Sequence, residues 1–141
     1  MSGVDNHRTG ILAELKAQEY YIKEGYEIYT PIMSQSKCDF VACKNSSTIK
    51  VQVKKASENP TKSGTYLQVR LQGKPTDFST REYTVEDFDE LLVVHNTGLW
   101  RFPVGLIIDK KSFTFGKLLD TGGVVTGKKA SVKTEDFKVD N

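Results

Sequence analysis

The sequence has no apolar run that could cross a membrane. No stretch approaches the roughly 18 consecutive apolar residues that a spanning helix needs, and the first residues lack the apolar centre of a secretion signal. Cysteine is scarce: Cys38 and Cys43 are the only two. On one expected strand, five residues apart, they would face opposite sides, so we expect reduced thiols and no disulfide. These absences favour a cytoplasmic protein without a membrane partner.

The sequence also has little net charge. Lys and Arg number 20 and Asp and Glu number 18, so the overall balance excludes few partners. The charges are unevenly distributed, however. Between residues 44 and 75 there are seven basic side chains and one acid, Glu58, whereas the next twenty residues hold six acids. The basic block is where a polyanion would be attracted.

The length of 141 residues suits one globular domain, and 38% hydrophobic with 27% charged residues is typical of a soluble one. We expect residues 1–120 to form this domain and residues 121–141 a basic and polar tail. One helix followed by many strands predicts an α/β (α+β) fold, with a mixed sheet flanked by helices. The expected strands are 26–32, 37–43, 49–56, 65–72, 91–95 and 99–104, with a loop at 57–64 and a short helix at 106–109.

A helix is expected from Thr9, which can cap it, to Gly25, which can end it. Ile11, Leu15 and Ile22 recur at helical spacing and are predicted to face the core. Glu14 lies on the border of that stripe, where a carboxylate can be held over a site against which the helix packs.

Polar and apolar residues alternate along 49–55, which predicts a strand with one core face and one polar face. Gln52 and Lys54 share the polar face. The turn before this strand predicts a hairpin with the strand at 37–43. That neighbouring strand carries Asp39 among apolar residues, where a carboxylate is costly unless it is paired, hydrogen-bonded or bound to a cation.

These side chains are expected to converge on one site. Two carboxylates and an amide oxygen suit a hard divalent cation such as Mg²⁺ or Mn²⁺ better than zinc, and a lysine beside them can orient a water molecule or stabilise charge on a phosphate. No organic cofactor is expected. The predicted catalytic set is Glu14, Asp39, Gln52 and Lys54, of which Glu14, Asp39 and Gln52 would ligate the metal.

The order of these residues resembles the PD-(D/E)XK nuclease superfamily. In that superfamily a helix glutamate precedes a strand aspartate and an acid-x-lysine strand, and the chain is most similar to the branch of group I intron homing endonucleases with glutamine in place of the last acid. The resemblance covers roughly residues 9–106. Its matching segments are 10–16, 25–27, 51–54, 83–89 and 102–104.

This resemblance implies a restriction-endonuclease-like core and a metal-dependent endonuclease. Two residues depart from the superfamily pattern. Cys38 stands where the family name has proline, which affects the entry to the strand more than the chemistry. Gln52 stands where most members have a carboxylate, so the metal site has one negative charge fewer.

We therefore expect a Mg²⁺-dependent, site-specific endonuclease of double-stranded DNA, in a bacterial, phage or organellar compartment with access to DNA. A small chain with one active site needs a second copy to cut both strands, so a homodimer or homotetramer is predicted. The alternatives are a Holliday-junction-resolvase-like nuclease, a DNA-binding module without activity, and a structural protein with an internal ion pair. Side chains expected to contact DNA are Lys55, Gln68, Arg70, Gln72 and Arg81.

Overall fold

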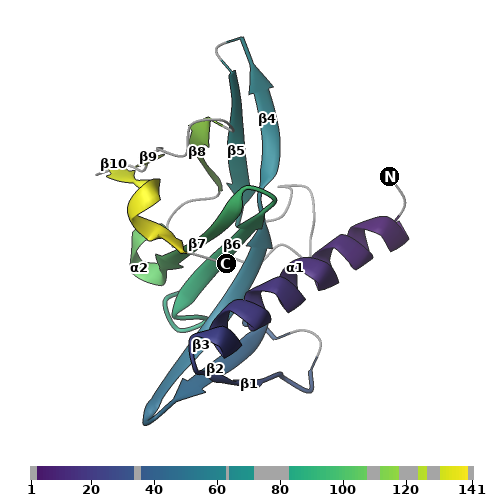
Figure 1. Cartoon of the computed structure of the whole chain (residues 1–141), viewed down its shortest axis with the longest axis vertical. Helices are drawn as coiled ribbons and strands as arrows, with labels where there is room; N and C mark the ends of the chain where they lie inside the picture. Colours follow the sequence, from purple (N-terminus) through teal and green to yellow (C-terminus); the bar gives the residue numbers. More distant parts are fainter. Residues whose placement is uncertain are drawn as a thin grey trace.

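The structure, a computed structural model, describes residues 3–33, 36–62, 64–71, 83–107, 112–117, 124–126 and 131–139. At its centre is a six-stranded sheet with the order β1-β2-β3-β6-β7-β11 (Figure 1). Strands β3 and β6 run parallel and the other neighbours run antiparallel, so the predicted mixed sheet is confirmed. Its strands are β1 (Glu27–Tyr29), β2 (Phe40–Lys44), β3 (Ser47–Lys55), β6 (Glu90–His95), β7 (Gly98–Pro103) and β11 (Lys138–Val139).

A second sheet has the order β4-β5-β8, and its β4–β5 ribbon extends away from the central sheet at the top of Figure 1. The prediction of a loop at 57–64 is wrong, because β4 pairs with β5 from Ser57 to Thr61. Pro60 is compatible with this strand because β4 is an edge strand, where a missing backbone donor is tolerated. The bounds are β4 (Ser57–Thr61), β5 (Gly64–Arg70) and β8 (Ser112–Lys117); β9 (Val124–Thr126) and β10 (Ser131–Lys133) form a separate pair.

Helix α1 (Gly3–Lys23) lies against the central sheet (Figure 1). It begins six residues before the predicted start at Thr9. It ends close to the predicted position, where Gly25 adopts a φ of 96°, a left-handed conformation that favours glycine. The other described helices are α2 (Val104–Ile107), close to the short helix predicted at 106–109, and a 3₁₀ turn at Thr134–Phe137.

The predicted core face of α1 is wrong. Ile11, Leu15 and Ile22 are exposed, at 44%, 54% and 57% of their surface. The face against the sheet instead carries the small residues Ala13 and Ala17, which are buried. Because alanine is small, the helix backbone can approach the sheet closely at these positions, whereas the last turns of α1 bury the large rings of Tyr20 and Tyr21. The strands contribute the other buried residues of this core, which are Phe40, Ala42, Val51, Leu92, Val94 and Leu99.

A polar network attaches the last turns of α1 to the sheet. Glu90 at the start of β6 accepts hydrogen bonds from Tyr21 Oη and Arg101 Nε, both at 2.7 Å. The Arg101 guanidinium also lies 5.1 Å from the centroid of the Tyr21 ring. Burial, followed by the Glu90 charge, raises the pKa of Tyr21, which stays protonated and donates. The network fixes the orientation of α1 across β6 and β7.

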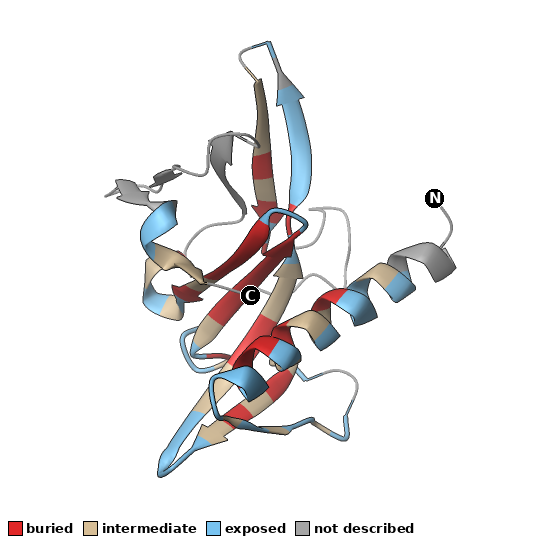
Figure 2. Ribbon diagram, viewed as in Figure 1, coloured by how far each residue is buried: buried red, intermediate tan, exposed pale blue. Residues whose placement is uncertain are grey.

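The opposite face of the central sheet forms a second core (Figure 2). Leu67 and Val69 of β5 are buried there, whereas Gln68 is half-buried and Arg70 is exposed, as the alternation of this strand predicted. The residues that share this core are Ala56, Leu67, Val69, Leu71, Phe88, Leu91, Val93, Trp100, Phe102 and Ile107.

The last described residues contact the central sheet. β11 pairs with β7, and the ring of Phe137 lies 5.3 Å from that of Phe102. The predicted division of the chain at residue 120 stays a prediction.

Both cysteines are free and half-buried. In the described part of the chain, no helix has both the length and the apolar character needed to span a bilayer.

Candidate functional site

The four predicted catalytic side chains line one cavity of about 400 Å³. Glu14 comes from α1, Asp39 from the residue just before β2, and Gln52 with Lys54 from β3. The β2–β3 hairpin was predicted and is confirmed, with Phe40 opposite Val51. Because Asp39 directly precedes this pair, it lies beside the last residues of β3, and α1 crosses above them.

Asp39 is fixed by backbone hydrogen bonds to β3. Its amide nitrogen donates to the Val51 carbonyl at 2.8 Å, and its Oδ2 accepts from the Val53 amide at 2.7 Å. The sequence placed Asp39 inside a strand, but β2 begins one residue later. The partner that a half-buried carboxylate requires is therefore the backbone of the neighbouring strand, and the carboxylate has a fixed position at the cavity.

The pKa values of both carboxyl groups in this cavity are raised. Burial raises the pKa of Asp39, and the Val53 amide and the Lys54 cation offset only part of this effect. Burial also raises the pKa of Glu14, and the charge of Asp39 raises it further. Because both carboxyl groups are disfavoured as anions in this cavity, a cation bound there would stabilise both. With the amide of Gln52 they offer an all-oxygen donor set, which fits Mg²⁺ or Mn²⁺.

Gln52 is buried, with 7% of its surface exposed. Its Nε2 donates to the Val53 carbonyl at 3.4 Å, which turns the amide oxygen away from that carbonyl. Lys54 is half-buried, and its Nζ lies 5.5 Å from the centroid of the Tyr83 ring. A cation–π contact of this kind restrains the ammonium group beside the carboxylates. Nothing in the sequence alone had indicated Tyr83 as a neighbour of Lys54.

The sequence analysis did not include His7 in the candidate site, but His7 lines the cavity. His7 precedes Glu14 by seven residues, which is two helical turns, so a helical spacing to Glu14 was the available signal.

In the part of the chain that is described, no group of three or more His, Cys, Asp or Glu side chains could hold a metal. The remaining lining residues are Gly10, Ile11, Ala13 and Val53.

The predicted DNA contacts are distributed over two elements. Lys55 is exposed at the end of β3 and lines the cavity that holds Asp39 together with two neighbouring cavities, of about 180 and 370 Å³. Gln68 and Arg70 share one face of β5, in the part of this strand that pairs with β8. Gln72 and Arg81 lie outside the described residues.

Comparisons with known proteins agree with the fold and with the family that the sequence resembles. A family described as PD-(D/E)XK endonuclease matches residues 4–138, a longer span than the 9–106 of the sequence resemblance. Protein 5.3 of Escherichia phage T7 is 37% identical over 113 residues, which are 80% of this chain and 92% of that protein. The structure of the bacterial homing endonuclease I-Ssp6803I matches with a TM-score of 0.64 and 18% identity, covering 92% of this chain and 83% of that one. At that identity the likeness concerns the fold, and it confirms the restriction-endonuclease-like architecture. The chain belongs to the PD-(D/E)XK endonuclease family.

Proposed function

We propose that this chain is a Mg²⁺-dependent, site-specific endonuclease that hydrolyses phosphodiester bonds of double-stranded DNA. The observation that supports the proposal most is the shared cavity of Glu14, Asp39 and Lys54. Its two carboxylates lie close enough for the charge of Asp39 to raise the pKa of Glu14. A soluble structural protein has no need for such an arrangement, whereas a nuclease uses it to hold a divalent cation beside a lysine.

Each residue of the cavity has a distinct role in this proposal. Asp39, Glu14 and the amide oxygen of Gln52 would hold the metal. The metal, when bound, would lower the pKa of a water molecule and neutralise charge on the scissile phosphate. Lys54 would position the attacking water and stabilise the charge that develops on phosphate oxygens. The Val53 amide holds the Asp39 carboxylate in place throughout, because its hydrogen bond belongs to the backbone of β3.

DNA would lie across the cavity and contact the β4–β5 ribbon. Lys55 is adjacent to the catalytic residues and would bind a phosphate next to the scissile one. The polar face of β5 would present Gln68 and Arg70 to base edges, because glutamine and arginine side chains can form paired hydrogen bonds with bases in the major groove. Gln72 and Arg81 stay candidates for DNA contacts from the sequence alone. A homing-type, sequence-specific activity is consistent with such a ribbon, and I-Ssp6803I, which shares the fold, is a homing endonuclease.

The proposal is tested by incubating the protein with a library of DNA duplexes and Mg²⁺ and sequencing the ends produced. We expect ends that share a recognition sequence, and no cleavage in the presence of EDTA. Asp39→Ala should abolish cleavage but keep DNA binding, whereas Asp136→Ala, which removes an exposed acid, should leave both unchanged. Preferential cleavage of four-way junctions would favour the resolvase alternative, and DNA binding without any metal-dependent cleavage would favour a binding module.

A further inference from the structure

The segment at residues 83–89, which leads into β6, places an aromatic ring beside the lysine of the cavity. Tyr83 is half-buried, and the centroid of its ring lies 5.5 Å from Lys54 Nζ. In the part of the chain that the structure describes, Lys54 forms no ion pair, although it lines the same cavity as Glu14 and Asp39. The contact that restrains the ammonium group is therefore the ring rather than a carboxylate.

Packing holds the Tyr83 ring in place. The ring of Phe88 contacts it edge-on, with the two centroids 5.2 Å apart and an angle of 78° between the ring planes. Phe88 is fully buried in the core that β5, β6 and β7 share, and Tyr83 packs against that core. A ring that is restrained in this way offers Lys54 a fixed surface.

Hydrogen bonds keep the segment in one conformation. Asp87 Oδ2 accepts from the Thr84 amide at 2.7 Å, and the Asp87 amide donates to the Thr84 carbonyl at 3.0 Å. Asp87 also forms an ion pair with Lys37, at 3.3 Å, and Lys37 precedes Asp39 by two residues. Because Thr84 follows Tyr83 directly, this network fixes the backbone that carries the ring.

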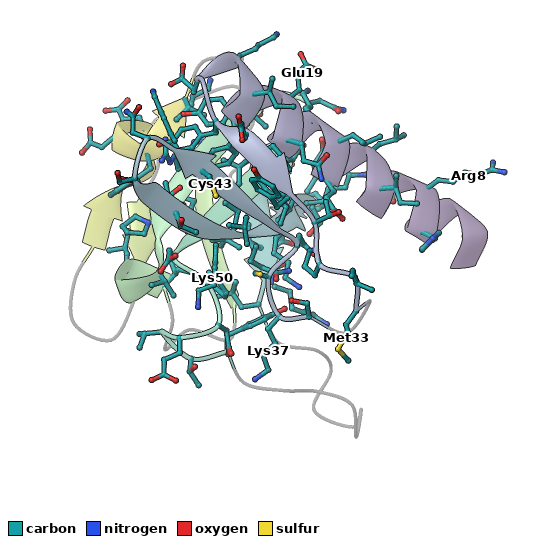
Figure 3. All side chains as sticks on the ribbon, turned by 90° about the horizontal axis from the view of Figure 1, so that it is seen from below. Arg8, Glu19, Met33, Lys37, Cys43 and Lys50 are labelled. Atoms are coloured by element: carbon teal, nitrogen blue, oxygen red, sulfur yellow. The ribbon has the colours of Figure 1, made fainter. Side chains whose placement is uncertain are left out.

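The same segment is bonded to β3, the strand that carries Lys54. Lys50 Nζ donates to the Glu86 carbonyl, and Figure 3 shows the Lys50 side chain toward the bottom of the view, away from α1. The Lys50 amide donates to Asp89 Oδ2 at 2.9 Å, and the Lys50 carbonyl accepts from the Asp89 amide at 2.8 Å. Since Lys50 and Lys54 belong to one strand, these bonds fix the position of Tyr83 relative to Lys54.

We propose that Tyr83 is a positioning residue for Lys54, whose ammonium group its ring holds at the cavity in the orientation that cleavage requires. The inference rests on the proposed function, which gives Lys54 its role. A lysine side chain is a flexible four-carbon stem, and fixing it before DNA binds avoids an entropy loss during the reaction. A carboxylate partner would neutralise the lysine charge, whereas the ring adds no negative charge and leaves the cation available to phosphate oxygens.

Nuclear magnetic resonance in EDTA, without DNA, tests the contact independently of any cleavage. A ring that faces the ammonium group shields the neighbouring Hε protons of Lys54, so their signals move upfield. Lys54→Met identifies these signals by removing them. We expect them upfield in the parent and in Tyr83→Phe, which keeps a ring, and at the ordinary lysine position in Tyr83→Leu. Ordinary lysine signals in the parent would overturn the contact.

Cleavage of a duplex that the parent cuts tests the positioning role. Tyr83→Leu should lower kcat about 10-fold and leave KM within about twofold, and Tyr83→Phe should restore kcat to within about twofold of the parent. In a Lys54→Met background, Tyr83→Leu should have no further effect on kcat, because the group that it positions is gone. Phe137→Leu is the matched control, since it removes an aromatic pair with Phe102 outside the cavity, and it should leave kcat unchanged.

Three results would overturn the positioning role. They are a parent-like kcat in Tyr83→Leu, a raised KM at unchanged kcat, which would make Tyr83 a DNA contact, and an equal loss of kcat with and without Lys54, which would make its role structural. If the parent cleaves no duplex but the Lys54 signals respond as described, the proposed function fails and the contact of Tyr83 with Lys54 stands.

Discussion

Replacing Asp39 by asparagine separates the two effects of this carboxylate. Asparagine retains an oxygen that can accept the Val53 amide hydrogen bond but removes the charge beside Glu14. Because burial raises the pKa of Asp39, its ionised form destabilises the metal-free fold. We therefore expect Asp39→Asn to melt at a higher temperature than the parent in EDTA at pH 8.

Added Mg²⁺ should reverse that order. At a free Mg²⁺ concentration ten times the dissociation constant, binding stabilises the folded parent by about 1.4 kcal/mol. Unfolding entropy of about 2.1 cal/mol/K per residue gives about 0.3 kcal/mol/K for a chain of 141 residues. The parent melting temperature should then rise by about 5 °C, and that of Asp39→Asn should not change. Differential scanning fluorimetry across a Mg²⁺ titration measures both values.

The pH dependence of these shifts has a definite sign. A carboxylate with a raised pKa contributes stability in acid and loses it as the pH rises through the folded-state pKa. The advantage of Asp39→Asn in EDTA should therefore be largest at high pH and vanish below the usual pKa of 3.8. The Mg²⁺ gain of the parent should shrink as the pH falls, since the metal needs ionised Asp39 and Glu14. An equal rise in melting temperature on addition of Mg²⁺ in the parent and in Asp39→Asn would refute the assignment of Asp39 as a metal ligand.

The remaining predictions concern Lys54 and Gln52 in the cavity and Tyr21 on α1. Lys54→Met should lower the cleavage rate by about 100-fold or more and leave DNA binding, measured by fluorescence anisotropy, within a few-fold of the parent. Gln52→Glu should lower the free energy of unfolding in EDTA by about 1–3 kcal/mol, because it buries a third carboxylate beside Asp39 and Glu14. The same variant should bind Mg²⁺ more tightly in calorimetry. Weaker Mg²⁺ binding would contradict a ligand role for this position. Tyr21→Phe should lower the free energy of unfolding by about 1–2 kcal/mol in urea titrations, because Glu90 loses a 2.7 Å hydrogen bond.

Where the sequence pattern had a period of two, it predicted the structure well. The alternation around Val51 placed Gln52 and Lys54 on the face away from the α1 core, and the turn before β3 predicted the hairpin that brings Asp39 alongside. These inferences succeed because side-chain direction in a strand follows from position alone. The convergence of the four candidate catalytic residues could therefore be predicted without coordinates, although their roles stay a proposal.

Where a prediction depended on the size and hydrophobicity of side chains, as for the core face of α1, it was wrong. Ile11 and Leu15 predicted the core face of α1, but Ala13 and Ala17 are buried there instead, together with the rings of Tyr20 and Tyr21, because close approach of the helix to the sheet leaves room only for small side chains in its middle turns. Pro60 was interpreted as part of a loop, although it lies on an edge strand. Neither outcome could be predicted from the sequence, since both depend on what lies beside the segment in space. Glu14 still reached the cavity, because it borders both faces of the helix.

The most direct test of the central claim is a cleavage assay with the parent and Asp39→Ala on one DNA substrate carrying the recognition sequence, with Mg²⁺ and with EDTA. The account predicts cleavage only for the parent with Mg²⁺, and DNA binding by both proteins within a few-fold in Kd. Undiminished Mg²⁺-dependent cleavage by Asp39→Ala would contradict the account, because no metal-dependent centre at Glu14, Asp39 and Lys54 could then be responsible for it.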